Sequence, residues 1–134
     1  MPGYSGTPLA RTLGIVEGSV VALIGAPDGV FDGRLPEGIS LRSQAKGRAD
    51  VVVAFYIQRA RLERAAARLG EMVFPAGGLW VAWPKRSSGV RTDMTEHVTR
   101  EILLPLGLVD NKVCAIDDTW TGFRYVWRLE RRRP

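Results

Sequence analysis

The stretch from Leu13 to Phe31, LGIVEGSVVALIGAPDGVF, decides the fold of this chain. It predicts the end of a helix, a turn, a buried strand over residues 19–24 and then a glycine-containing loop. Open α/β sheets hold their ligands at such a loop, beyond the carboxyl end of the strand. A nucleotide-binding turn has a second glycine where this chain has Pro27, so the sequence predicts an altered ligand loop.

Strands and helices alternate along the rest of the chain. The sequence predicts further strands at residues 39–42, 50–56, 79–83, 112–116 and 124–129, helices at residues 8–13 and 58–69, and a third helix capped by Asp93. The middle strands are apolar on both faces, which favours a parallel sheet, and the last two are typical of an antiparallel hairpin. We therefore expect a three-layer, Rossmann-like α/β sandwich with a mostly parallel sheet of about six strands.

One connection in this layout is short. Only residues 43–49 separate the second strand from the third, and a crossover helix needs more chain than that. Either an extended segment crosses back over the sheet, or the second strand is a poorly formed edge.

Size and composition indicate one globular domain, residues 1–134, with a basic tail at residues 130–134. Of the 134 residues, 46% are hydrophobic and 25% are charged, which is ordinary for a soluble domain. The only cysteine, Cys114, excludes a disulfide within the chain and favours a cytoplasmic location. No signal peptide or membrane span is predicted, because the longest apolar run, residues 51–57, is far shorter than the roughly 20 residues a membrane helix needs.

The net charge of +5 and pI of about 10.0 raise the question of a nucleic-acid partner. The basic residues are not organised for that role. Four arginines, Arg128 and residues 131–133, lie at the extreme C-terminus, and those of residues 61–68 share the outer face of one helix. We expect neither a nucleic acid nor a membrane as partner, and homodimerisation through an edge strand stays open.

The order of these elements resembles a shortened class I methyltransferase core. The resemblance is carried by LGIVEGSVVALIGAPDG, by PAGGLWVAWP, and by GLVDNKVCAIDDTWTGFRYVWR, which are the glycine loop, a turn before a late strand, and the terminal hairpin. It implies the fold of a truncated methyltransferase and makes S-adenosylmethionine a ligand to consider.

Three motifs resemble a family of short bacterial proteins classed only as a domain of unknown function. They are GYSGTPLA (residues 3–10), GGLWVAWPK (residues 77–85) and LGLVDNKVCAIDDTW (residues 106–120). This resemblance implies the same fold and a bacterial, cytoplasmic origin, and it implies no activity.

The chemistry of a nucleotide or methyl-donor site is incomplete in this sequence. Such a site needs free backbone N–H groups at the first turn and a carboxylate after the second strand to hold the ribose. Pro27 removes one N–H donor, and Asp28 adds a negative charge beside it. Residues 42–46, RSQAK, contain no acid. We therefore expect no cofactor, with S-adenosylmethionine as the one left open.

A small anion is a second candidate ligand. The loop WPKRSSG offers two cations and two hydroxyls near a helix N-terminus, at the carboxyl ends of the strands. The other interpretation is a solvated loop in which Ser87, Ser88 and Asp93 cap the helix. The candidate crevice comprises Gly25, Pro27, Gly29, Trp83, Lys85, Arg86, Ser87, Ser88, Asp93 and Thr95.

No catalytic or metal-binding set is predicted. His97 is the only histidine and has no second ligand nearby in the sequence, while Asp117 and Asp118 are better placed to form a turn. The leading hypothesis is a non-catalytic module that binds a small anionic ligand or an unknown protein. The alternatives are an S-adenosylmethionine-dependent methyltransferase and a basic nucleic-acid-binding protein.

Overall fold

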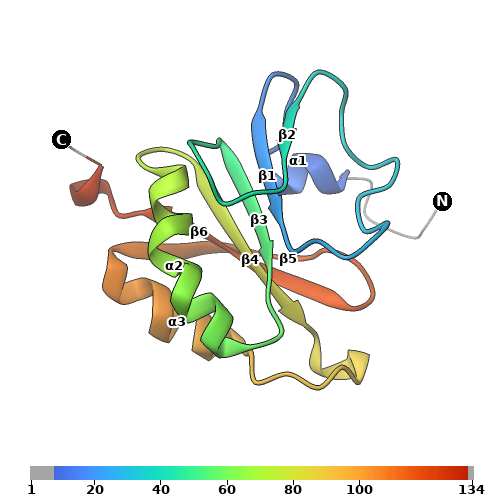
Figure 1. Cartoon of the computed structure of the whole chain (residues 1–134), viewed down its shortest axis with the longest axis vertical. Helices are drawn as coiled ribbons and strands as arrows, with labels where there is room; N and C mark the ends of the chain where they lie inside the picture. Colours follow the sequence, from blue (N-terminus) through green and yellow to red (C-terminus); the bar gives the residue numbers. More distant parts are fainter. Residues whose placement is uncertain (1–7, 133–134) are drawn as a thin grey trace.

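The computed structural model describes residues 8–132, which form one six-stranded sheet with the order β2-β1-β3-β4-β6-β5 (Figure 1). Four strands are parallel: β1 (Val20–Ile24), β2 (Ser40–Arg42), β3 (Val51–Phe55) and β4 (Gly78–Pro84). The last two, β5 (Leu108–Ala115) and β6 (Trp120–Trp127), form an antiparallel hairpin, with β6 between β4 and β5. The predicted α/β sandwich with a terminal hairpin is confirmed.

Helices cover both faces of this sheet. Helices α2 (Arg59–Val73) and α3 (Glu96–Leu103) pack on one face, and the shorter α1 (Leu9–Leu13) packs on the other, together with the chain between β1 and β2 (Figure 1). Because side chains alternate along a strand, Ala22 of β1 joins the core under α2, while Val21 joins the core under α1. Strands β3 and β4 are buried throughout, as their apolar sequences predict.

Helix α1 ends as the sequence predicts. Gly14 adopts the left-handed conformation, with φ of 84°, and closes the helix. The helix's last carbonyl groups find distant partners: the Trp80 indole Nε1 donates to the Leu13 carbonyl at 3.0 Å, and Lys112 Nζ donates to the Thr12 carbonyl at 3.3 Å. These bonds fix α1 to β4 and β5. The N-cap expected at Thr7 lies outside the described residues.

The short connection after β2 contains no helix. Strand β2 pairs in parallel with β1, with Val20 opposite Ser40, so the chain must cross back to start β3 on the other side of β1. Residues 43–50 make this crossing in an irregular conformation. The first of the two predicted alternatives is therefore confirmed, and β2 is the edge of the sheet, only three residues long.

The predicted bounds of the hairpin are wrong, because both strands are longer and their loop is shorter. The Asp117 carboxylate accepts hydrogen bonds from the backbone N–H groups of Thr119 and Trp120, each at 2.8 Å, and turns the chain within four residues. Beyond β6, Leu129–Arg131 form a short 3-10 turn, η3, which includes the start of the predicted tail. Within residues 8–132 no helix is both long and apolar enough to cross a membrane.

Candidate functional site

The carboxyl ends of β1, β3 and β4 meet at one edge of the sheet, beside the start of β6 (Figure 1). The chain leaves β1 outward to β2 and then returns to β3, so the switch point of the sheet lies between β1 and β3. Ligands of open α/β sheets bind in the crevice at this point. The edge is therefore where a functional site is expected.

Gly25 follows β1 directly and faces the end of β3. Its φ is 67°, a conformation that only glycine adopts readily, and it is exposed to solvent. A Cβ atom at this position would lie 3.2 Å from the carbonyl oxygen of Phe55. Glycine is therefore favoured here by its backbone conformation and by this close contact with β3.

The loop after Gly25 continues in successive turns rather than in a helix. Backbone N–H groups of Val30, Asp32 and residue 34 donate to carbonyl groups three residues earlier, the first of them to Pro27. Val30 and Phe31 are buried and anchor the loop to the core under α1. No α-helix N-terminus therefore points from this loop toward the crevice.

The chain after β2 encloses an open depression of about 440 Å³. Its lining is made of Leu41, Arg42, Ser43, Gln44, Lys46 and Gly47. The Arg42 guanidinium donates to the carbonyl of Lys46 at 2.8 Å and so shapes one wall. The lining contains hydroxyl, amide and cationic groups and no carboxylate, as the sequence predicts for this position.

The end of β3 supplies a tyrosine. The backbone N–H of Tyr56 donates to the carbonyl of Ala82 at 2.9 Å, which continues the pairing of β3 with β4. Burial raises the pKa of the Tyr56 phenol above its usual value, so the phenol keeps its proton at neutral pH.

The segment between β4 and α3 contains the predicted anion loop. The backbone N–H of Lys85 donates to the carbonyl of Thr119 at 2.7 Å, tying this segment to the hairpin. Ser88 Oγ donates to the Lys85 carbonyl at 2.6 Å and accepts from Val90 N–H at 3.2 Å. Ser88 is therefore occupied within its own 3-10 turn, η1 (Arg86–Ser88), while the exposed Arg86 and Ser87 face solvent.

Asp93 does not cap the helix that follows it. The cap of α3 is Thr95, whose hydroxyl accepts from the backbone N–H of Val98 at 3.1 Å. Asp93 instead accepts from the backbone N–H of Arg59 at 2.7 Å and so caps the start of α2. The neighbouring Thr92 hydroxyl donates to the carbonyl of Ile57, just before α2. The predicted grouping of Asp93 with the α3 N-terminus is wrong, because Asp93 crosses to another element.

Aromatic side chains lie beneath the edge. Trp120 packs edge-to-face on Phe55 with ring centres 5.2 Å apart, and Phe55 in turn meets Phe31 at 6.2 Å. Trp120 is only half-buried. Trp83 is buried against Phe123 at 5.2 Å and supports the edge from the α3 side. The candidate crevice predicted from the sequence does not include Trp120, although the position of this residue before the last strand is a signal for this edge.

Two other chemically reactive residues lie outside the candidate crevice, on α3 and on β5, where Cys114 is opposite Gly122 of β6. His97 is exposed on α3, with its Nε2 3.7 Å from Glu101, and burial raises the pKa of the Cys114 thiol on β5. Among residues 8–132 no group of three His, Cys, Asp or Glu side chains could hold a metal. The structure brings Gly25, Trp83 and Lys85 to one edge and places Asp93 and Thr95 at two different helix starts.

The fold is similar to those of several solved structures. Neither models of known protein families nor curated proteins match the sequence. Among solved structures, a protein of Thermoplasma acidophilum assigned as a methyltransferase superposes with a TM-score of 0.62 and 11% identity, covering 92% of this chain and 75% of that one. Magnesium protoporphyrin IX methyltransferase of Synechocystis, solved with bound S-adenosylmethionine, gives a TM-score of 0.61 and 12% identity, covering 90% and 76%.

A further similar structure comes from Sulfolobus solfataricus and is assigned as a type 11 methyltransferase, with a TM-score of 0.60 and 9% identity, covering 90% of this chain and 89% of that one. The fold is therefore that of class I methyltransferases in a truncated form. The leading hypothesis from the sequence, a non-catalytic module, is contradicted by these neighbours, which favour the methyltransferase alternative.

Proposed function

We propose that this chain is an S-adenosylmethionine-dependent methyltransferase that holds its donor at the carboxyl ends of β1, β2 and β3. The observation that carries the proposal is the exposed glycine turn at Gly25, which lies at the switch point of a sheet shared with methyltransferases. Similar structures include complexes with S-adenosylmethionine and with S-adenosylhomocysteine.

Two groups of residues fit an adenosyl ligand. The exposed backbone of Gly25 presents no side chain to the ligand at the first turn. Ser43 and Gln44, in the depression after β2, offer hydroxyl and amide groups that hydrogen-bond to ribose hydroxyls in place of the usual carboxylate. The donor supplies an electrophilic methyl group on its sulfonium sulfur.

The chain's own residues prepare the acceptor side. Phe55 and Trp120 form an apolar edge-to-face pair at the ends of β3 and β6, beside the proposed donor site. Tyr56 stays protonated, because burial raises the pKa of its phenol, and so adds no negative charge beside the donor.

Two features lower the affinity for the donor relative to a full nucleotide site. Pro27 supplies no N–H group, and the depression after β2 contains Arg42 and Lys46 in place of an acid. These cations repel the sulfonium of S-adenosylmethionine but leave the neutral thioether of S-adenosylhomocysteine unaffected.

Calorimetric titration of the purified protein tests the proposal. We expect S-adenosylhomocysteine to bind with one site per chain, at ligand concentrations up to about 1 mM, where even a binding free energy near −4 kcal/mol is measurable. Adenosine alone serves as the comparison ligand, because it shares the ribose contacts and lacks the amino-acid part. No heat with either ligand at these concentrations would contradict the proposal.

A further inference from the structure

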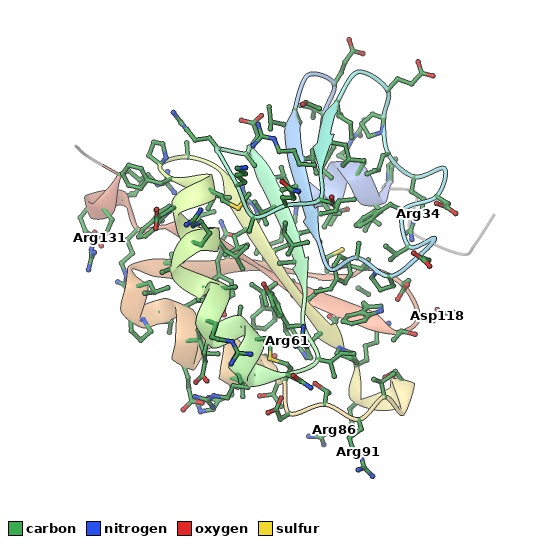
Figure 2. The ribbon with its side chains drawn as sticks, viewed as in Figure 1. Arg34, Arg61, Arg86, Arg91, Asp118 and Arg131 are labelled. Carbon is green, nitrogen blue, oxygen red and sulfur yellow. The ribbon has the colours of Figure 1, made fainter. Side chains whose placement is uncertain are left out.

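The segment from Lys85 to Arg91 carries an uncompensated positive charge. Within residues 8–132, the basic side chains that form ion pairs are Arg59, His97 and Arg100, so Lys85, Arg86 and Arg91 have no carboxylate partner. Figure 2 shows Arg86 and Arg91 projecting from the end of the molecule toward which β4 runs. Three cations therefore lie at the edge that holds the candidate site.

Two carboxylates near this segment in the fold, Asp93 and Asp117, accept hydrogen bonds from the backbone. Asp93 accepts from the first N–H group of α2, where the helix dipole stabilises its negative charge. Asp117 accepts from two N–H groups of the hairpin turn. Asp118 projects from a different part of the molecule than Arg86 and Arg91 (Figure 2). The three cations are thus free to meet an external anion.

Both ends of the segment are held in place. At its start, the backbone of Lys85 is bonded to Thr119, and the turn that follows is closed by Ser88. At its far end, Thr92 is bonded to Ile57 and Asp93 to Arg59. A segment fixed in this way loses little conformational freedom when it binds a ligand, which favours affinity.

We infer that this segment binds a small anion bearing at least two negative charges, and that this anion is part of the methyl acceptor. The assignment of this anion to the methyl acceptor rests on the proposed function, whereas the anion site itself rests on the three unpaired cations. A small molecule is favoured over a nucleic acid because Arg34 and Arg131 project from other parts of the molecule than Arg86 and Arg91 (Figure 2).

Titration with inorganic pyrophosphate at constant ionic strength tests the site. The variant R86A/R91A removes two of the cations, and R64A/R68A removes two exposed arginines from the outer face of α2 with the same change in net charge. We expect the wild type and R64A/R68A to bind alike, and R86A/R91A to bind about tenfold or more weakly, since two charge-assisted contacts are lost.

Three results would overturn the inference. The first is that the wild type does not bind pyrophosphate, and the second is that both variants lose the same affinity for it. The third is that a single-stranded oligonucleotide binds more tightly than pyrophosphate and that both variants weaken this binding. Titration of R86A/R91A with S-adenosylhomocysteine separates this inference from the proposed function. If this variant binds S-adenosylhomocysteine as the wild type does but has lost pyrophosphate binding, the result supports both the anion site and the proposed function. If the wild type binds pyrophosphate but not S-adenosylhomocysteine, the anion site is supported and the methyltransferase proposal fails.

Discussion

At the scale of single residues, the proposed donor site depends most on Gly25. The chain offers a matched control for it in Gly33, which has the same φ of 67° but open space where a Cβ would be added. Any difference between alanine substitutions at these two positions therefore reports the contact with the Phe55 carbonyl and with a ligand, and not the backbone strain alone.

We expect Gly33→Ala to lower the free energy of unfolding by about 1–2 kcal/mol, the usual penalty of a left-handed conformation for a residue with a side chain. Gly25→Ala should lower it further, because its Cβ would press on the Phe55 carbonyl oxygen at 3.2 Å. Gly25→Ala should also weaken binding of S-adenosylhomocysteine, whereas Gly33→Ala should leave it unchanged. Chemical denaturation and calorimetry measure the two effects, and equal behaviour of the two variants would refute the role of Gly25.

Because of the buried Tyr125, we expect the free energy of unfolding to depend on pH above pH 10. Its hydroxyl is buried and lies 2.7 Å from Thr99 Oγ1, and burial raises its pKa to about 12. In the unfolded chain the phenol titrates near its ordinary value of about 10. Because the folded state holds the proton more tightly, the stability from Tyr125 is complete below pH 10 and is lost as the pH rises from about 10 to 12.

Unfolding measured from pH 8 to 12 should therefore show a decline above pH 10, and the decline should be shallower in Tyr125→Phe, which cannot ionise. The slopes are compared rather than the absolute stabilities, because the variant also lacks the bond to Thr99. A variant slope as steep as that of the wild type would show that other groups cause the decline.

At the scale of elements, the segment between β4 and α3 is bonded through its side chains to the starts of two helices. Asp93 caps α2 and Thr95 caps α3, although only two positions separate them. The sequence pattern of an acid followed three residues later by Glu96 is typical of a capping box, so it predicted Asp93 as the cap of α3. Local patterns cannot reveal the distant N–H of Arg59, and this is why the prediction failed.

We expect Asp93→Ala to lower the free energy of unfolding by about 1 kcal/mol, the usual effect of removing a helix cap. Asp93→Asn should retain most of the stability, because its amide oxygen can still accept from the Arg59 backbone. Asp118→Ala is the control, since Asp118 is exposed. Equal thermal midpoints for the alanine variants at 93 and 118 would contradict the capping role.

At the scale of the whole molecule, the sequence predicts much of the fold and little of the site. The apolar runs of β1, β3 and β4, the helical periodicity of α2 and the glycine at 14 are strong local signals, and each predicted element is present. The depression after β2 and the packing of Trp120 on Phe55 depend on contacts between residues far apart in the chain. Such contacts leave no periodic pattern in the sequence.

The charge distribution of the molecule predicts a preference between ligands. Arg42 and Lys46 line the depression, so the cationic donor should bind more weakly than its neutral product. A repulsion of about 1 kcal/mol corresponds to about fivefold in affinity. We expect S-adenosylhomocysteine to bind at least that much more tightly than S-adenosylmethionine at low salt, with the difference shrinking as salt is added. Tighter binding of S-adenosylmethionine would place its sulfonium away from these cations.

A crystal structure of the protein soaked with S-adenosylhomocysteine tests the central claim most directly. The account predicts an adenosyl group seated at the turn of Gly25, with its ribose toward Ser43 and Gln44 and its sulfur near the end of β3. A ligand bound at another edge of the sheet, or no bound ligand at saturating concentration, would contradict it.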